Sequence, residues 1–403
     1  MKLVSPRVIK GNRGDLLSRW GILCAVAELG IGPIDVFCSR TVHLPPRIAN
    51  PVDYGPVYNL IPPFKGWLAL IRAKVALWTG GLDLQDDSSL AKLVHTWLVF
   101  SIYRLLGLKI ICVCQGAGPL DSRAGRFLAR AVLNQVAVFM ARDKGTFNLA
   151  TSLKSRTRLI RAHDGIFLPG FEDAGVRVRI LEELKDQFAP EIDGPLIAIN
   201  IRMWFHFTGG LMPYHYAQSA YRNRALERMA DFENAAAKLV LRLRKELNAR
   251  VVLVSMYEPG VEEWEDDATW LASLKSRFAD DPAVVRCEKD LTIPEFFAMM
   301  SCFDLVIGTR LHSTLSALRG GVKAIHLAYT LKGRDIFASL RLDEFAVDLE
   351  RFMESPDQVF DLARTTIERR DLNDRIQQVC QRVIRENREA LREALALVGA
   401  LDR

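Results

Sequence analysis

The chain has 403 residues, more than one hydrophobic core usually holds, which predicts two domains. Its 49% apolar and 25% charged residues are typical of a soluble folded protein and exclude a disordered chain. The net charge of +6 comes from scattered Lys and Arg, without a basic block or an aromatic–basic repeat. This pattern excludes a nucleic-acid binder and favours a small anion or an anionic membrane surface as the partner.

The first predicted strand, residues 2–9, leads into the loop Gly11-Asn-Arg-Gly-Asp15 and then into a helix over residues 16–29. This layout is typical of a phosphate-binding loop, although the loop is neither a Walker A motif nor a dinucleotide fingerprint. Asp15 has two interpretations that the sequence leaves open. It is either the N-cap of the helix or a base that accepts a proton from a sugar hydroxyl.

Further strands are predicted over residues 34–38, 75–79, 136–140 and 159–162, with another ending at residue 114. The Pro-rich residues 45–63 are predicted to be a long connection. Helices alternate with the strands, which predicts a parallel sheet whose carboxyl ends share one edge. Arg142 at that edge either pairs with Asp143 or faces a ligand, and Asp164 is interpreted as a structural cap near a hinge. The same edge carries Gly80-Gly81 followed by Asp86, and Gln115-Gly-Ala-Gly-Pro119.

The longest apolar region, residues 90–114, is broken by His95, Arg104, Gly107 and Lys109. It therefore predicts a helix followed by a strand and not a membrane span. The pair Cys112-x-Cys114 is expected to face one side of that strand and lacks partners at zinc-ligand spacing. The seven cysteines are interpreted as buried thiols in a reducing compartment. No secretory signal pattern opens the sequence, which predicts a cytoplasmic protein.

A second domain is predicted to begin with a strand over residues 196–201 that ends at Arg202. Residues 203–215, rich in aromatic side chains and His, are a candidate acceptor-binding loop. Thr292 and Glu295 form a capping-box pattern at the start of a helix. One apolar stripe over residues 372–398 predicts a long C-terminal helix. We therefore expect an N-terminal domain over residues 1–170, a linker over 171–194 and a C-terminal domain over 195–403.

Residues 304–332 have the strongest functional pattern. A strand over 304–307 is followed by a helix over 312–319, and a second strand over 323–328 leads to Lys332. Arg310 and His312 lie at a strand-to-helix junction, where backbone N–H groups and the helix dipole attract anions. A guanidinium binds anions through paired hydrogen bonds, and an imidazole exchanges protons near neutral pH. The alternative is a surface arginine and a structurally satisfied histidine at a helix N-terminus.

The chain resembles the polysaccharide pyruvyl transferases. Their C-terminal signature reads here as Arg310-Leu-His-Ser313, Gly321-Val322 and Tyr329-Thr-Leu-Lys332. The family's Gly-Asn-x-Gly-Asp and Gln-Gly-x-Gly-Pro elements correspond to the loop beginning at Gly11 and to the one beginning at Gln115. The family's Gly-Gly-Gly element is one glycine short here, at Gly80-Gly81.

The resemblance implies two Rossmann-like doubly wound α/β domains facing a cleft, which is the GT-B-like arrangement, with a long terminal helix. The implied reaction transfers pyruvate from phosphoenolpyruvate to a sugar diol of a polysaccharide or of its lipid-linked precursor, without cofactor or metal. The mild positive charge and the lack of a secretory signal pattern predict peripheral contact with the inner membrane. His312 is the expected general acid, and Asp15 and Asp86 are candidate bases. The expected substrate-binding residues are Asn12, Gln115, Arg142, Arg202, Arg310, Leu311 and Lys332.

Two other functions remain open at this point. A GT-B glycosyltransferase would use the same arginines to hold the pyrophosphate of a nucleotide sugar. It would also need an acidic residue for the ribose, for which Asp335 and Asp343 are the candidates. The second alternative is a sugar- or anion-binding protein without catalysis, which the intact Arg310-Leu-His312 and Lys332 argue against.

Overall fold

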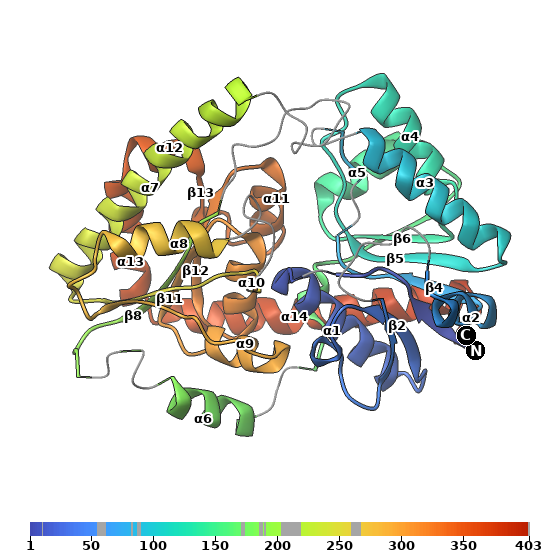
Figure 1. Cartoon of the computed structure of the whole chain (residues 1–403), viewed down its shortest axis with the longest axis horizontal. Helices are drawn as coiled ribbons and strands as arrows, with labels where there is room; N and C mark the ends of the chain where they lie inside the picture. The colour runs from blue at the N-terminus through green and yellow to red at the C-terminus, as the bar shows by residue number, and fades with distance from the viewer. Residues whose placement is uncertain are drawn as a thin grey trace.

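The computed structural model describes residues 1–9, 11–54, 62–81, 84–86, 90–170, 174–184, 188, 191–202, 219–258 and 267–401. Two parallel sheets with flanking helices build the molecule, and a long helix runs between them (Figure 1). The predicted α/β class with two doubly wound domains and a C-terminal helix is confirmed. The exact domain limits at 170 and 195 stay a prediction. The candidate acceptor loop at residues 203–215 lies outside the described residues.

The first sheet has seven parallel strands in the order β3-β2-β1-β4-β5-β6-β7. Short apolar runs form these strands because a sheet covered by helices on both faces buries nearly every side chain. The strands are β1 (Leu3–Ser5), β2 (Ile34–Cys38), β3 (Ala49–Asp53), β4 (Val75–Trp78), β5 (Lys109–Gln115), β6 (Val138–Ala141) and β7 (Arg158–Arg161).

The second sheet has six parallel strands in the order β10-β9-β8-β11-β12-β13. Its central strand β11 pairs with β8 and β12, and Gly308 at its end lies opposite Asn200 and His326. The strands are β8 (Leu196–Asn200), β9 (Arg250–Leu253), β10 (Val284–Arg286), β11 (Leu305–Gly308), β12 (Lys323–Ala328) and β13 (Ala346–Asp348).

Helices cover both faces of each sheet. On the first sheet, α2 (Phe64–Arg72), α3 (Leu90–Leu105), α4 (Arg123–Leu133) and α5 (Lys144–Ser152) pack over one face. The opposite face is covered by α1 (Arg13–Glu28) and part of α14 (Asp371–Leu397), and the short 3₁₀ helix η2 (Gly165–Phe167) packs against both of these helices. The second half of the chain contributes α6 (Ala174–Glu183), α7 (Ser219–Leu247), α8 (Asp267–Ser276), α9 (Ile293–Met300), α10 (Leu311–Arg319), α11 (Leu331–Ser339), α12 (Leu349–Glu354) and α13 (Pro356–Glu368).

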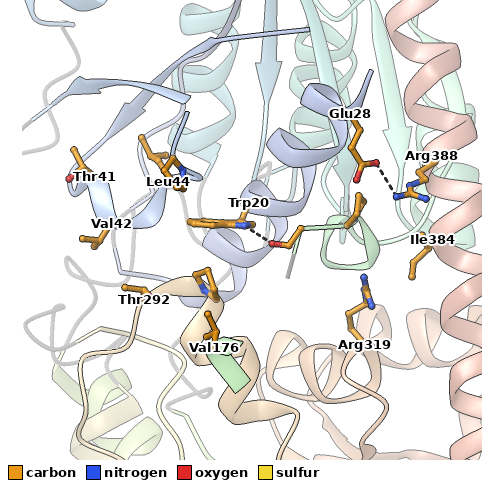
Figure 2. A pocket seen from close by; sticks show the side chains of 14 residues that line it. Trp20, Glu28, Thr41, Val42, Leu44, Val176, Thr292, Arg319, Ile384 and Arg388 are labelled. Atoms are coloured by element: carbon orange, nitrogen blue, oxygen red, sulfur yellow. Dashed lines mark hydrogen bonds and ion pairs between the residues drawn. The ribbon is translucent and has the colours of Figure 1, made fainter. Parts of the chain in front are cut away.

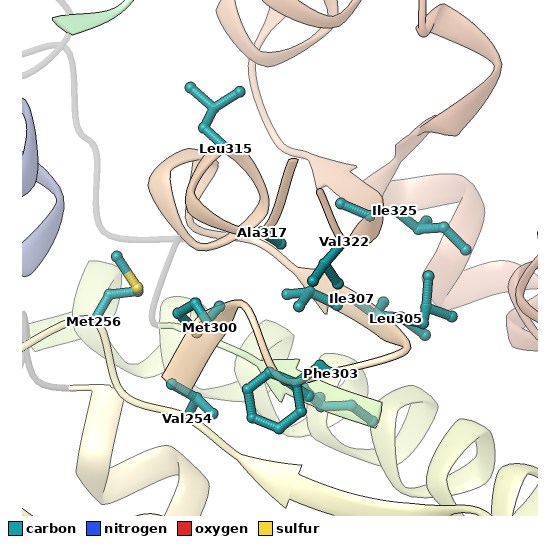
Figure 3. Packing of buried hydrophobic residues seen from close by; sticks show 14 of the residues in the cluster. Val254, Met256, Met300, Phe303, Leu305, Ile307, Leu315, Ala317, Val322 and Ile325 are labelled. Atoms are coloured by element: carbon teal, nitrogen blue, oxygen red, sulfur yellow. The ribbon is translucent and has the colours of Figure 1, made fainter. Parts of the chain in front are cut away.

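The core of the second domain packs around β11 and α10. Leu305 and Ile307 of β11 lie between Ala317 on one side and Met300 and Phe303 on the other (Figure 3). These apolar side chains fix the strand-to-helix turn that carries the Arg-Leu-His sequence. The capping box predicted at the start of α9 is confirmed, since the N–H of Thr292 donates to Oε2 of Glu295 over 2.9 Å.

The terminal helix α14 belongs to both cores. Its first half buries Ile376, Cys380 and Val383 in the core of the second domain. Its second half buries Leu391 and Leu395 against the first sheet, so the helix crosses from one domain to the other (Figure 1). Within the part of the chain that the structure describes, no helix has the length and apolar character that spanning a bilayer requires.

Two local predictions are corrected. Cys112 and Cys114 face opposite sides of the sheet, because β5 bulges after Cys112 and Cys114 adopts a φ of 53°. Burial raises the pKa of both thiols. The long connection after β2 contains the edge strand β3, where Pro51 is tolerated because an edge strand can leave an N–H unpaired.

Candidate active site

The first turns of α1 and α10 meet between the two domains. Asn12 caps α1, because its Oδ1 accepts the N–H of Gly14 over 3.0 Å and that of Asp15 over 3.3 Å. The interpretation of Asp15 as the N-cap is therefore wrong. The side-chain amide of Asn12 donates to the hydroxyl of Tyr257 in the other domain over 3.3 Å. One end of this predicted substrate-binding side chain thus caps α1, and the other end contacts the second domain.

The backbone around Asn12 strengthens this contact between the domains. The N–H of Arg13 donates to the carbonyl of Met256, and the N–H of Glu258 donates to the carbonyl of Gly11, both over 2.9 Å. The start of α1 therefore has a fixed position relative to the carboxyl end of β9.

His312 lies in the first turn of α10 and reaches the first domain. Its Nε2 is 3.2 Å from Oδ2 of Asp164, and its ring packs against Gly14 at the start of α1. The side chain of His312 is 17% exposed, so the ring is held by protein yet remains reachable from solvent. The structure thus brings the predicted general acid to the N-termini of two helices from different domains.

Asp164 connects His312 to Arg142. Its Oδ2 also lies 3.2 Å from Nη1 of Arg142, and its Oδ1 accepts the N–H of Ile166. Burial opposes the charged form of Asp164. The neighbouring His312 and Arg142 and the N–H of Ile166 nevertheless hold the pKa of this carboxyl well below its ordinary range. Arg142 is closer to Asp164 than to Asp143, whose carboxylate is 3.9 Å away.

Asp164 is a site residue that was not predicted from the sequence. Its interpretation as a cap is correct for η2, but Asp164 also binds His312 and Arg142. Its position after β7, at the sheet edge that carries Arg142, was the sequence feature that could have identified it as a site residue.

Arg310, the second residue of the predicted pair, is held by a buried carboxylate. Its Nε and Nη2 lie 2.9 and 2.7 Å from Oδ1 of Asp267, which is fully buried. The guanidinium also lies 4.4 Å from the ring centre of Tyr257. Burial lowers the pKa of Arg310, but attraction to Asp267 outweighs it and raises this pKa above its ordinary value. Asp267 and Tyr257 are further site residues that the sequence analysis missed.

The other predicted cations contact neutral groups nearby. Arg202 at the end of β8 donates to the hydroxyl of Tyr329 over 3.1 Å. Lys332 at the start of α11 donates to Oε1 of Gln85 in the first domain over 2.7 Å. Leu311 is the first residue of α10, where the backbone N–H groups have no acceptor within the helix. Arg202, Lys332 and the N-terminus of α10 are therefore three further sources of positive potential.

The two candidate bases have different surroundings. Asp15 forms an ion pair with Arg7 over 3.2 Å, in the turn of α1 against which His312 packs. Asp86 accepts three hydrogen bonds, from the backbone N–H groups of Asp121 and Ser122 and from the hydroxyl of Ser122. Burial opposes the charge of Asp86, yet these bonds lower its pKa. This bonding fits a structural carboxylate better than a base.

Gln115 lies at the end of β5. Its Nε2 donates to the carbonyl of Val113 over 2.6 Å, whereas its Oε1 is buried without a hydrogen-bond partner. Among the described residues, no group of His, Cys, Asp and Glu side chains is arranged to hold a metal ion.

A cavity of about 1040 Å³ lies near the opposite ends of α1 and α10, between the two domains and α14. Trp20 lines it and donates to the carbonyl of Gly170 over 3.0 Å, and Arg388 pairs with Glu28 across it (Figure 2). None of the predicted catalytic or substrate-binding residues lines this cavity.

Solved structures similar to this chain share its fold. A putative UDP-N-acetylglucosamine 2-epimerase from Listeria monocytogenes superposes with a TM-score of 0.54 at 11% identity, covering 98% of this chain and 97% of that one. Anabaena Alr3699/HepE in complex with UDP-glucose gives a TM-score of 0.56 at 12% identity, covering 98% and 99%. These similarities show a GT-B-like fold. No curated protein sequence matches the chain.

The model of one protein family, described as polysaccharide pyruvyl transferase, matches residues 12–330. The matched region begins at the capping residue Asn12 and includes Arg142, Asp164, Arg310 and His312. It covers most of the two sheets and both helix N-termini that meet at His312. The chain therefore belongs to the polysaccharide pyruvyl transferase family and is an enzyme of the transferase class.

Proposed function

We propose that the protein transfers pyruvate from phosphoenolpyruvate to a sugar diol, forming a cyclic ketal and releasing phosphate. The acceptor is a polysaccharide or its lipid-linked precursor. The observation that carries this proposal is the position of His312, which joins buried Asp164 to the N-termini of α1 and α10. Helix N-termini attract anions, and phosphoenolpyruvate carries both a phosphate and a carboxylate.

The donor would bind between the two domains. Arg142, Arg202, Arg310 and Lys332 supply the positive charges, through charge-assisted hydrogen bonds to the phosphate and the carboxylate. Backbone N–H groups at the start of α10, beginning with Leu311, would add further donors. In this proposal the cations neutralise the phosphate, and neither a metal nor a cofactor takes part.

His312 would supply the proton that converts the enol methylene into a methyl group. Asp164 accepts the Nε2–H of His312, so Nδ1 is the nitrogen that would carry the reactive proton. Protonation of the methylene carbon leaves positive charge on the adjacent carbon, which one sugar hydroxyl attacks. The carbon–oxygen bond to phosphate then breaks, and the second hydroxyl closes the ring at the same carbon.

Each of the two sugar hydroxyl groups loses a proton when it bonds to the ketal carbon. One of these protons would go to a carboxylate and restore the proton of His312, while the other leaves with the phosphate. Asp15 is the better placed of the two predicted bases, because it follows Gly14 in the turn that contacts His312. To accept a proton, Asp15 would have to break the ion pair between its Oδ2 and Arg7 or use its other carboxylate oxygen.

A donor assay in D₂O tests this function. The protein is incubated with phosphoenolpyruvate or with nucleotide sugars, each together with glycan acceptors. We expect phosphate release from phosphoenolpyruvate that depends on the acceptor, and one solvent deuterium in the methyl group of the ketal. Release of a nucleotide instead would identify a glycosyltransferase, and a methyl group without deuterium would contradict the protonation step.

We also propose that the enzyme works in the cytoplasm at the inner surface of the membrane, where it meets lipid-linked glycans. The positive net charge of +6 supports contact with anionic lipids. Cell fractionation tests this location, and recovery of the protein outside the cytoplasmic membrane would contradict it.

A further inference from the structure

Helix α3 is apolar on both sides. Its inner side buries Leu93, Phe100 and Tyr103 against the first sheet. Its outer side would normally be polar on a surface helix, but it presents a continuous apolar stripe at helical spacing. The exposed fractions of the stripe are 40% for Val94, 36% for Trp97, 50% for Leu98, 42% for Ile102 and 88% for Leu105.

The neighbouring helices also present large apolar side chains to solvent. α2, α3 and α4 cover the same face of the first sheet, and α3 and α4 lie side by side (Figure 1). Phe64 and Ile71 of α2 are 77% and 58% exposed, and Phe127 of α4 is 72% exposed. We call the outward surface of these three helices the α2–α4 face. So many exposed large apolar side chains on one surface indicate a partner.

The charge of the α2–α4 face has one sign. Helices α2 and α3 each contain two Lys or Arg residues, and α4 contains three. None of the three helices contains Asp or Glu. No ion pair joins any of these seven cations to a described residue. The seven are Lys65, Arg72, Lys92, Arg104, Arg123, Arg126 and Arg130.

We propose that the α2–α4 face binds the surface of an anionic lipid bilayer, with α3 lying in the plane of the membrane. An apolar stripe flanked by Lys and Arg is the pattern of helices that rest at the boundary between headgroups and acyl chains. Trp97 is the side-chain type that prefers this boundary. The basic residues would contact anionic headgroups, while Leu98, Ile102 and Leu105 enter the acyl region.

The charge argues against a second copy of the chain as the partner. A twofold dimer places the same surface of each subunit against itself. The α2–α4 face would then bring its cations together without opposing carboxylates, and like charges across an interface are costly. An anionic bilayer instead complements both the apolar and the basic side chains.

Binding to this face does not depend on the proposed pyruvyl transfer. The face is formed by α2–α4, whereas His312 and its partners lie at the starts of α1 and α10. The two proposals can therefore fail separately. If both hold, the face would keep the enzyme at the membrane that carries a lipid-linked acceptor.

Vesicle co-sedimentation tests the proposal with the full chain. We expect binding to vesicles of phosphatidylglycerol mixed with phosphatidylcholine, weaker binding to pure phosphatidylcholine, and release as salt screens the charges. Lys92→Gln combined with Arg104→Gln should weaken binding by about fivefold for each charge removed. Leu98→Ser combined with Leu105→Ser should weaken it by at least about tenfold.

A matched control uses exposed apolar residues on another helix. Val178 and Leu181 of α6 are 57% and 41% exposed, and Val178→Ser with Leu181→Ser should leave vesicle binding unchanged. Phosphoenolpyruvate binding by calorimetry should be the same for all these variants and the wild-type protein, which separates this test from the proposed function.

Three outcomes would overturn the proposal. The first is a wild-type protein that does not bind anionic vesicles at low salt. The second is vesicle binding that the α3 variants leave intact. The third is a dimer in solution that Leu98→Ser with Leu105→Ser dissociates while vesicles remain unbound, because the face would then contact a second copy of the chain.

Discussion

The imidazole of His312 occupies the space that a side chain on Gly14 would fill. A Cβ atom on Gly14 would lie only 2.3 Å from Nδ1 of His312 and 2.6 Å from its Cβ. The two residues belong to different domains, and each lies in the first turn of its helix. The position of the proposed acid therefore depends on a glycine about 300 residues away in the sequence.

Gly14→Ala should lower turnover without unfolding the protein. The added methyl group displaces His312, and a shift of about 1 Å in a catalytic group costs on the order of 10²-fold in rate. Alanine is also a better helix former than glycine, by about 1 kcal/mol, which offsets part of the crowding cost. Steady-state kinetics and denaturant unfolding would measure both effects.

The control for this substitution is Gly32→Ala, since nothing lies within 4 Å of the Cβ position of Gly32. Both variants should fold, and Gly14→Ala should unfold at a somewhat lower denaturant concentration than Gly32→Ala because of the crowding at His312. Normal turnover by Gly14→Ala would show that His312 does not need its present position.

His312→Gln should retain donor binding and lose turnover by ~10²-fold or more, because glutamine donates hydrogen bonds but does not supply the proton. The matched control is His163→Gln. His163 is 16% exposed and bonds a carboxylate oxygen of Glu386 over 2.7 Å, so its surroundings are similar. Calorimetry with phosphoenolpyruvate and a phosphate-release assay separate binding from chemistry. Near-normal turnover by the His312 variant would exclude it as the acid.

Arg310→Ala should destabilise the fold, because it leaves the carboxylate of Asp267 buried without its cation. Breaking such a pair costs about 3–5 kcal/mol of the free energy of unfolding. Arg310→Lys keeps the charge but loses the forked contact, and should cost less. If Arg310 binds the donor, the lysine variant should also weaken phosphoenolpyruvate binding by roughly 1.5–3 kcal/mol. If a folded Arg310→Lys variant binds phosphoenolpyruvate as tightly as the wild-type protein, the role of Arg310 is purely structural.

The stability of the protein should fall as the pH drops from about 6.5 to about 4. Burial lowers the pKa of His326 to about 4, although the hydrogen bond to the Gly308 carbonyl opposes this shift, whereas the pKa of a histidine in the unfolded chain is about 6.5. Between these values the unfolded state binds a proton that the folded state excludes, so stability is present above the unfolded pKa and declines below it. The loss is roughly 3 kcal/mol. His326→Asn should lack this part of the pH dependence in denaturant unfolding, and an unchanged slope would contradict it.

Much of the fold was readable from local patterns. The predicted strands over residues 34–38 and 323–328 have the bounds of β2 and β12. Strand β3 was missed because Pro51 breaks the usual strand pattern, although an edge strand accepts it. Cys114 was placed on the wrong face because alternation does not reveal a bulge.

The site was only partly predictable, for a physical reason. Arg310 and His312 stand out because their residue types and spacing carry the chemistry. Their carboxylate partners Asp267 and Asp164 are distant in the sequence, and no local pattern indicates which acid a buried cation selects. The capping of the first helix by Asn12 is a local contact, whereas its bond to Tyr257 joins residues 245 positions apart and follows from the tertiary fold alone.

Because α14 packs in the cores of both domains, it affects the order in which the chain folds during synthesis. All seven strands of the first sheet have been synthesised once Arg161 is added to the chain. The apolar surface that Leu391 and Leu395 cover nevertheless stays open until the second sheet has been made as well. The first domain to be synthesised is therefore the last to be completed, and its nascent form exposes a surface prone to aggregation throughout that interval.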